Sequence, residues 1–346
     1  MFGIPFLTIE IFTLLLGIAL FAPFVMFPAL SRAGGGIFGF SPPQFQAFVI
    51  LMIAIVLSPF SLYPVLLMKV LCFAMFACAY NLLIGYVGLG SFGHAAFFGM
   101  GGYIAAYTAK KWGFTPEVAI VVGGLVGAAL GGVFGWLAIG RQGIYFAMIT
   151  LALSQMVFFF CTQAPFTGGE DGIQQVPRGK LFGAISLQDD MTMYVVVAVI
   201  FVAVFLLIHR IVHSPFGQIL KAIRENEPRA ISLGYRTDDY KLLVFILSAG
   251  IAGIAGGTKS IVFGIATLTD VANAMSGEVI LMTLVGGMGT IFGPVLGALI
   301  LNFIESYLAQ LGAWFAVTQG IIFVLCIMFF RRGILGELAA RLKVAL

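Results

Sequence analysis

Three short patterns in this chain have the residue types of a nucleotide or metal site. The run 88–93 (G-L-G-S-F-G) matches the glycine fingerprint of dinucleotide-binding proteins, and the run 253–260 (G-I-A-G-G-T-K-S) resembles a phosphate-binding loop. His209 and His213 are spaced as zinc ligands on a helix can be. Each pattern lacks its context: a strand before the fingerprint, a Gly-Lys pair in the loop, a third ligand near the histidines. We therefore predict no nucleotide, metal or catalytic site in this chain.

Polar side chains inside apolar runs are the better functional candidates. Such residues are costly in lipid, so they face protein or a water-filled pathway. We predict that Ser91, His94 and Glu278 lie near a permeation pathway. For His94 the alternative is a buried structural histidine, and for Glu278 it is a position at the membrane interface. The polar residues found within apolar runs are Asn81, His94, Gln155, Glu278, Asn302 and Glu305.

The charged residues concentrate in one segment between two apolar runs. Residues 209–241 contain six of the 18 lysines and arginines, and four more lie at 331, 332, 341 and 343. Basic residues beside membrane spans mark the cytoplasmic side. We therefore place 209–241 and the C-terminus in the cytoplasm, where the polar segment would meet a soluble partner. The net charge of +4 then reports orientation and does not indicate nucleic-acid binding.

Helix signals divide this polar segment, residues 214–241, into two short helices. Ser214 suits an N-cap and Pro215 the first helical position. Four apolar residues then follow at helical spacing and define one face of an amphipathic surface helix. A second helix is predicted to start near 226–228 and to end at Leu233, with Gly234 as a left-handed cap. The alternative is an ordinary basic loop. The four apolar residues are Phe216, Ile219, Leu220 and Ile223.

The composition is that of a membrane protein with several helical spans. Of the 346 residues, 61% are hydrophobic and 9% are charged, whereas a soluble domain carries about 25% charge. The mean hydropathy is +1.10. No basic n-region precedes Arg32, so we expect no cleaved signal peptide. We predict an all-α polytopic fold with about ten transmembrane helices. The eleven candidate spans are 9–30, 45–62, 65–86, 91–109, 117–139, 143–163, 191–213, 241–265, 277–287, 291–310 and 314–331.

Two glycine-rich stretches predict broken helices. If 209–241 is inside, the chain must pass from outside at 276 to inside at 331, which takes an odd number of crossings. We predict three crossings, with a break near 286–294, and a re-entrant segment near 85–100 is an alternative for the first half. The two stretches resemble each other faintly, as internal repeats of transporters do.

Glycine spacing and loop composition add two expectations. Small residues recur every fourth position at 123–135 and 249–257, a pattern that lets helices pack closely. The outer loop 164–190 is either a docking surface or a solvated connector. The four cysteines lie in apolar runs, and we expect buried thiols.

Four stretches of the sequence together resemble permease subunits of branched-chain amino acid ABC importers. They are S-P-F-G-Q-I-L-K-A-I-R-E-N-E-P-R-A-I-S-L-G-Y (214–235), N-L-L-I-G-Y-V-G-L-G-S-F-G-H-A-A-F-F-G-M-G-G-Y (81–103), T-G-G-E-D-G-I (167–173) and G-G-M-G-T-I-F-G-P-V-L-G-A-L-I-L (286–301). The resemblance covers about 65–332. It implies N-terminal transmembrane segments at 1–60 and a permease core at 61–346.

The resemblance also implies a role for the polar segment. Glu227, Ala230 and Gly234 match the core of that family's coupling loop, and Arg224, Glu225 and Leu233 flank it. The implied partners are a related permease subunit, two cytoplasmic ATPase subunits that hold ATP and magnesium, and a periplasmic binding protein. The chain would then be a non-enzymatic importer subunit of the bacterial inner membrane, working by alternating access. Urea, short amides or other organic solutes are alternative cargoes, and a self-sufficient secondary transporter or channel is the alternative mechanism.

Overall fold

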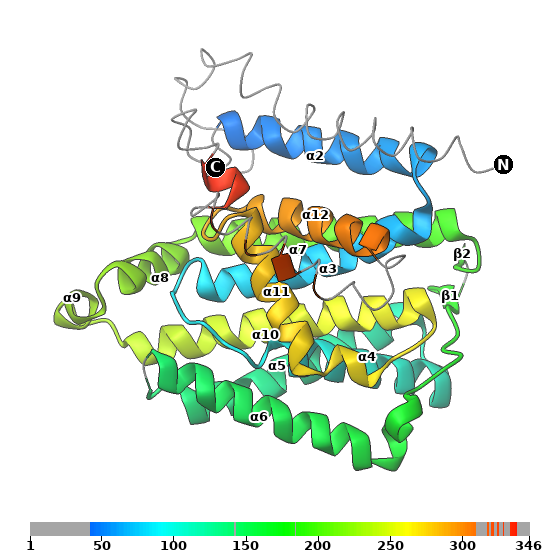
Figure 1. Ribbon diagram of the computed structural model, residues 1–346, viewed down its shortest axis with the longest axis horizontal. Helices are drawn as coiled ribbons and strands as arrows, with labels where there is room; N and C mark the ends of the chain where they lie inside the picture. Colours follow the sequence, from blue (N-terminus) through cyan, green and yellow to red (C-terminus); the bar gives the residue numbers. More distant parts are fainter. Residues whose placement is uncertain are drawn as a thin grey trace.

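The structure is a computed structural model that describes residues 42–308 except 142 and 184, single positions between 317 and 328, and residues 333–337. In this part of the chain the architecture is a helical bundle (Figure 1). The helices are α2 (Pro42–Ser61), α3 (Pro64–Ile84), α4 (His94–Lys111), α5 (Pro116–Ala138), α6 (Ile144–Gln163), α7 (Asp190–His213), α8 (Pro215–Glu225), α9 (Glu227–Ser232), α10 (Thr237–Phe263), α11 (Asn273–Gly286) and α12 (Gly293–Leu308). Short 3₁₀ turns (η3, Pro165–Thr167; η4, Gly169–Asp171; η5, Leu268–Asp270) and an antiparallel strand pair (β1, Lys180–Leu181; β2, Ile185–Ser186) complete it.

Five of these helices are long and apolar enough to cross a bilayer: α3, α5, α6, α7 and α10. Helices α2, α11 and α12 contain shorter apolar stretches. Nine of the eleven predicted spans coincide with a helix, which confirms the all-α polytopic fold. The predicted span 9–30 and most of 314–331 lie outside the described residues, so the number of crossings stays a prediction.

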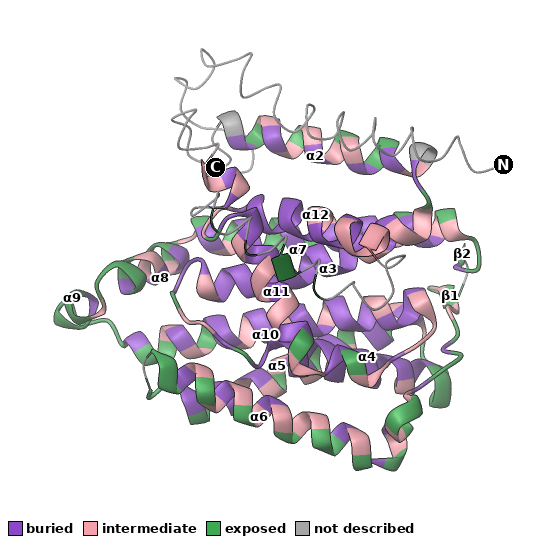
Figure 2. Cartoon of the chain, viewed as in Figure 1, coloured by how far each residue is buried: buried purple, intermediate pink, exposed green. Residues whose placement is uncertain are grey.

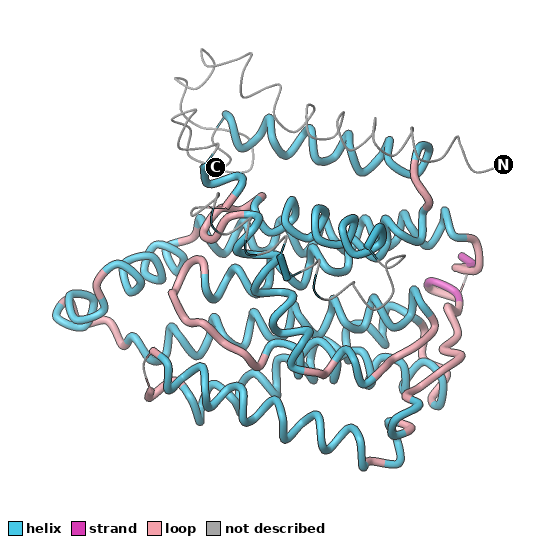
Figure 3. Tube along the Cα trace, viewed as in Figure 1, coloured by secondary structure: helices cyan, strands magenta, loops and turns pink. Residues whose placement is uncertain are grey.

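Both predicted breaks are present as irregular segments between helices. The first break, residues 85–93, joins α3 to α4, and the second break, residues 287–292, joins α11 to α12 (Figure 3). Gly287 and Gly289 adopt φ angles of 125° and 80°, which side chains with a Cβ rarely adopt. These two glycines end α11 and turn the chain before Pro294 lets α12 begin.

The predicted small-residue stripes pack against each other where α4, α5 and α10 meet. A Cβ on Gly101 would lie 2.5 Å from Gly253 Cα, one on Gly253 would lie 2.6 Å from Gly123 O, and one on Gly123 would lie 2.6 Å from Gly101 O. The backbones of α4, α5 and α10 therefore contact one another pairwise at Gly101, Gly123 and Gly253, and we call this region the glycine junction. Figure 2 shows that α10, which supplies Gly253, is mostly buried. Cys72, Cys78 and Cys161 are buried free thiols, as predicted, and Cys326 lies outside the described residues.

The loop 164–190 is fastened to the bundle. Ile173 pairs with Ala266 as an antiparallel bridge, with N–O distances of 3.0 and 2.9 Å. A Cβ on Gly172 would lie 2.2 Å from Ala266 O, so the two backbones meet closely. The loop is thus held to the turn that follows α10, and whether it docks a partner stays a prediction.

Candidate functional site

Helices α8 and α9 project from one end of the bundle, at the left of Figure 1. Ser214 caps α8 by accepting a hydrogen bond from Gly217 N at 3.3 Å, and Pro215 occupies the first turn, as predicted. Leu220 and Ile223 are buried. Phe216 stacks on Tyr240 of α10, with ring centroids 5.7 Å apart. The apolar face of α8 therefore packs on the bundle, while its opposite face is free to meet a partner.

Helix α9 is short and capped at both ends. Asn226 Oδ1 accepts from Arg229 N at 3.1 Å. At the other end Gly234 has φ 89°, and Tyr235 N donates to Ala230 O at 3.2 Å, the bond pattern of a left-handed helix cap. The predicted second helix with its glycine cap is confirmed. Six residues give a rod about 9 Å long, which we call the lever (residues 226–235).

The lever is tied to α10 by a charged contact that the sequence analysis missed. Glu227 Oε1 accepts from Lys241 Nζ and, at 3.3 Å, from Thr237 Oγ1. The Lys241 side chain is only 4% exposed. Glu227 and Lys241 are 14 residues apart, on either side of a turn. No sequence pattern predicts that they pair, because only the fold brings them together. This contact fastens the lever to the first turns of α10.

The predicted coupling residues other than Glu227 separate into three groups. Glu225, Leu233 and Gly234 are exposed at the tip, and Ala230 is buried beneath it. Arg224 is also exposed, but its guanidinium reaches the bundle, where it donates to Gly85 O. Ile231, which no sequence signal singled out, is 55% exposed, and Leu233 is 69% exposed. The lever thus exposes two aliphatic side chains near its C-terminal end.

The opposite end of the bundle carries charges from five elements. Lys69 of α3 pairs with Glu305 of α12 at 3.0 Å, and Lys259 of α10 pairs with Asp270 of η5. Glu278 of α11 interacts electrostatically with both pairs. It has no ion-pair partner within bonding distance among the described residues. The structure therefore places Glu278 in a mixed-charge cluster near the helix ends.

Ser91 and His94 lie inside the packed helices. Ser91 Oγ accepts from Gly93 N at 3.1 Å, so it shapes the first break. His94 Nε2 is 2.8 Å from Ser248 Oγ, and Ser248 donates its proton to Ala79 O at 2.6 Å. The imidazole must therefore donate to Ser248, since the hydroxyl proton is already engaged. Both side chains are fully buried in this conformation. They do not meet Glu278, and their place on a pathway stays a prediction.

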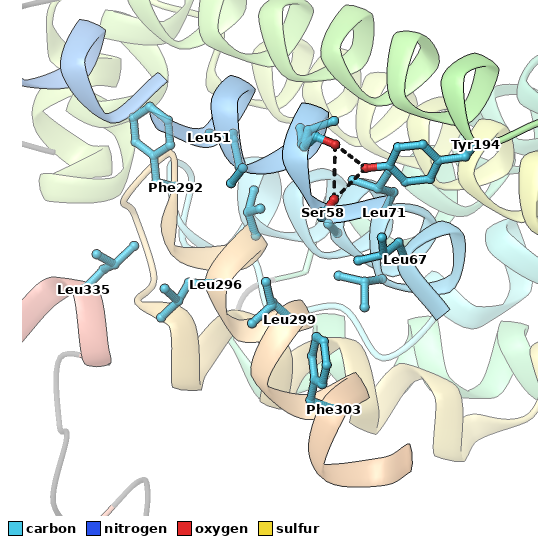
Figure 4. A pocket seen from close by; sticks show the side chains of 15 residues that line it. Leu51, Ser58, Leu67, Leu71, Tyr194, Phe292, Leu296, Leu299, Phe303 and Leu335 are labelled. Atoms are coloured by element: carbon cyan, nitrogen blue, oxygen red, sulfur yellow. Dashed lines mark hydrogen bonds between the residues drawn. The ribbon is translucent and has the colours of Figure 1, made fainter. Parts of the chain in front are cut away.

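An apolar pocket of about 70 Å³ lies between α2, α3, α7 and α12 (Figure 4). Its lining has no charged side chain. Its two hydroxyl groups have partners: Ser58 Oγ and Tyr194 Oη each lie within hydrogen-bond distance of Ile55 O and lie 3.0 Å from each other. A charged solute would lose its hydration there without compensation, so we assign the pocket to helix packing.

The nucleotide and metal patterns occur in structures that do not support those chemistries. Residues 88–93 connect two helices without a strand, and 253–260 lie within the continuous helix α10. Across the described residues, no three His, Cys, Asp or Glu side chains gather as metal ligands do. His213 Nδ1 donates to His209 O at 3.0 Å, as neighbours on one helix can.

The family model that this sequence matches and three relatives of the chain are all named as permease components or permease proteins of branched-chain amino acid transport. Residues 64–330 match the family model "Branched-chain amino acid transport system / permease component". LivM of Escherichia coli strain K12, a high-affinity branched-chain amino acid transport system permease protein, is 26% identical over 76% of this chain and 68% of its own length. A probable LivM of Methanocaldococcus jannaschii is 27% identical over 53% of each chain. LivH of E. coli K12 is 23% identical over 77% of this chain and 91% of its own. No solved structure matches. The match spans most of the chain and includes both breaks and the lever, and the protein therefore belongs to the family of permease components of branched-chain amino acid transport systems.

Proposed function

We propose that this chain is the membrane subunit of an ATP-driven importer that moves branched-chain or related hydrophobic amino acids into the cytoplasm by alternating access. The carrying observation is the lever: a capped rod with an exposed apolar tip that is fastened to α10 through Glu227 and Lys241. When the ATPase subunits close on ATP, a subunit bound to the tip would transmit that movement through the lever to the bundle. The residues for this contact are Glu225, Ile231, Leu233 and Gly234.

The proposed complex needs partners on both sides of the membrane. A related permease subunit would pair with this chain, since both LivM and LivH proteins are among its relatives. Two cytoplasmic ATPases would hold ATP and magnesium. A periplasmic binding protein would deliver substrate to the opposite end, near loop 164–190. In this proposed arrangement, 209–241 and the C-terminus lie on the cytoplasmic side of a bacterial inner membrane.

Glu278 is our proposed pathway residue. Because an amino acid carries both charges, its path must offer polar groups to offset lost hydration. The mixed-charge cluster of Lys69, Glu305 and Glu278 supplies both signs near the outer helix ends. Ser91 and His94 would contribute in a state that opens the first break.

The deciding experiment is reconstitution of the assembled complex in proteoliposomes. ATP inside with binding protein and leucine outside should drive uptake. A panel with urea and short amides tests the alternative cargoes. Uptake by this chain alone, driven by an ion gradient without ATPase subunits, would contradict the proposal and favour a secondary transporter.

Replacing Gly234 with valine should uncouple the complex. No atom within 4 Å opposes a Cβ there, so the cost comes from φ 89° and is about 1–3 kcal/mol for a β-branched residue. The cap would rearrange and the tip would point elsewhere, so leucine uptake should fall at least tenfold. Asparagine, which tolerates this conformation, is the matched control and should retain most uptake. Equal uptake by the valine variant would argue against the assigned role.

Replacing Glu278 with glutamine should lower leucine uptake while the complex still assembles. The substitution keeps size and removes the charge that faces the cluster. Uptake and ATP hydrolysis are measured on the same vesicles, with Glu170→Gln in loop 164–190 as a control for simple loss of outer charge. Unchanged uptake kinetics would remove Glu278 from the pathway.

A further inference from the structure

Arg224 is an exposed residue whose guanidinium reaches back from the tip to the bundle. Its Nη1 donates to Gly85 O, at the end of α3. Helix α3 has no basic residue in its last turn, although its terminal carbonyls carry partial negative charge. Arg224 supplies that cation from another helix. One turn earlier on α8, Lys221 Nζ lies 5.8 Å from the ring centroid of Tyr86, so two cations of α8 hold the same turn.

Glycines make room for this arginine in both breaks. A Cβ on Gly88 would lie 3.5 Å from Arg224 Cγ, and one on Gly289 would lie 3.0 Å from Arg224 Nη1. The guanidinium therefore sits where the first and second breaks meet. A planar fork with five N–H donors suits such a place, because it can bond several carbonyls at once.

Asn81, one turn before Gly85, ties the last turn of α3 to the second break. Its Oδ1 accepts from Gly289 N at 3.0 Å, and its Nδ2 donates to Thr290 O at 2.9 Å. Asn81 is 2% exposed and in the last turn of α3. A movement of this turn must therefore move the second break or cost two part-buried hydrogen bonds. The second break in turn ends α11, which carries Glu278.

We propose that Arg224 is a positioning residue that transmits motion of α8 to both intramembrane breaks, with Asn81 as the second link. The route runs from α8 through Arg224 to Gly85, through Asn81 to the second break, and on to α11. It is separate from the contact of Glu227 with Lys241, which acts on α10. This inference rests on the proposed function, since it assigns how that coupling reaches the pathway.

The test compares uptake with ATP hydrolysis in the reconstituted complex. Arg224→Gln should assemble with the ATPases and hydrolyse ATP at near the normal rate, while leucine imported per ATP falls about tenfold. Arg224→Lys keeps the charge but loses the fork, and should recover part of the ratio. Arg210→Gln removes a cation near the same end of the bundle and should leave the ratio unchanged.

A double-mutant cycle checks the route. If Arg224 and Asn81 act in series, Asn81→Ala combined with Arg224→Gln should lower uptake per ATP little more than either change alone. Fully additive losses would overturn the route. An unchanged ratio in Arg224→Gln would also overturn it, as would loss of ATPase binding, which would make Arg224 an ATPase contact.

Poor accumulation of the Arg224→Gln variant and failure of the proposed function itself give different results. If Arg224→Gln does not accumulate, the folded Arg224→Lys variant decides: a lowered ratio supports the inference and a normal ratio overturns it. Failure of the proposed function would show differently, as absence of ATP-dependent uptake by the unaltered complex.

Discussion

Replacing Gly253 with alanine should prevent this protein from accumulating in a folded form. The new Cβ would lie 2.6 Å from Gly123 O and 3.2 Å from the Cα atoms of Gly124 and Gly127. All three obstacles are backbone atoms, so no side chain can rotate away, and α5 would have to shift from α10. Overpacking costs about 1–3 kcal/mol where a core can adjust, and more where backbones collide. We expect a loss of at least 3 kcal/mol on that basis.

Size-exclusion profiles and thermal unfolding in detergent measure this effect. Gly132→Ala is the matched control, because it lies on α5 but its Cβ would be 3.8 Å from the Ile246 side chain. Alanine is also the better helix former, so the control should be as stable as the unaltered chain or slightly more. A Gly253→Ala protein with unchanged melting would mean that the glycine junction is looser than described.

Replacing Glu227 with alanine should abolish coupled uptake. The change leaves the Lys241 ammonium, whose side chain is 4% exposed, without the carboxylate it binds. Breaking such a pair costs about 3–5 kcal/mol when fully buried; the 22% exposure of Glu227 lowers this to roughly 2 kcal/mol. The loss falls on the attachment of the lever to α10, so ATP hydrolysis should continue without import.

The readout is leucine uptake and ATPase activity of the same vesicles. Asp238→Ala removes an exposed acid from the first turn of α10 and should leave both activities near normal. Combining Glu227→Leu with Lys241→Met replaces the charges by apolar contact and should restore lever attachment and part of the uptake. If Glu227→Ala imports leucine normally, the lever does not act through α10.

Local signals in the sequence were enough to predict much of this fold. The apolar runs, the Ser214 cap, the Gly234 cap and both glycine breaks each depend on neighbouring residues. The same holds for the four-residue repeats of the glycine junction. Contacts between residues distant in the sequence could not be predicted, because no residue near Glu227 indicates that it pairs with Lys241. The same is true of Arg224 and Gly85.

Arg224 is the instructive case. The family resemblance implied a coupling role at the ATPase for Arg224, alongside Glu225. In the structure Arg224 is exposed, and its guanidinium bonds Gly85 O because α8 lies beside the carbonyls at the end of α3. Whether Arg224 also contacts an ATPase stays a prediction. Only the crossing of α8 and α3 brings the Arg224 guanidinium to Gly85 O. A single sequence does not show how two helices cross.

Helix α10 has a consequence for regulation. Its 27 residues span about 40 Å. One end holds the lever through Lys241, and the other holds Asp270 and leads to the bridge between Ala266 and Ile173. A stiff rod of this kind connects loop 164–190 to the lever. Thermodynamic linkage then requires reciprocity: if a ligand on the loop tightens nucleotide binding by some factor, nucleotide must tighten that ligand by the same factor.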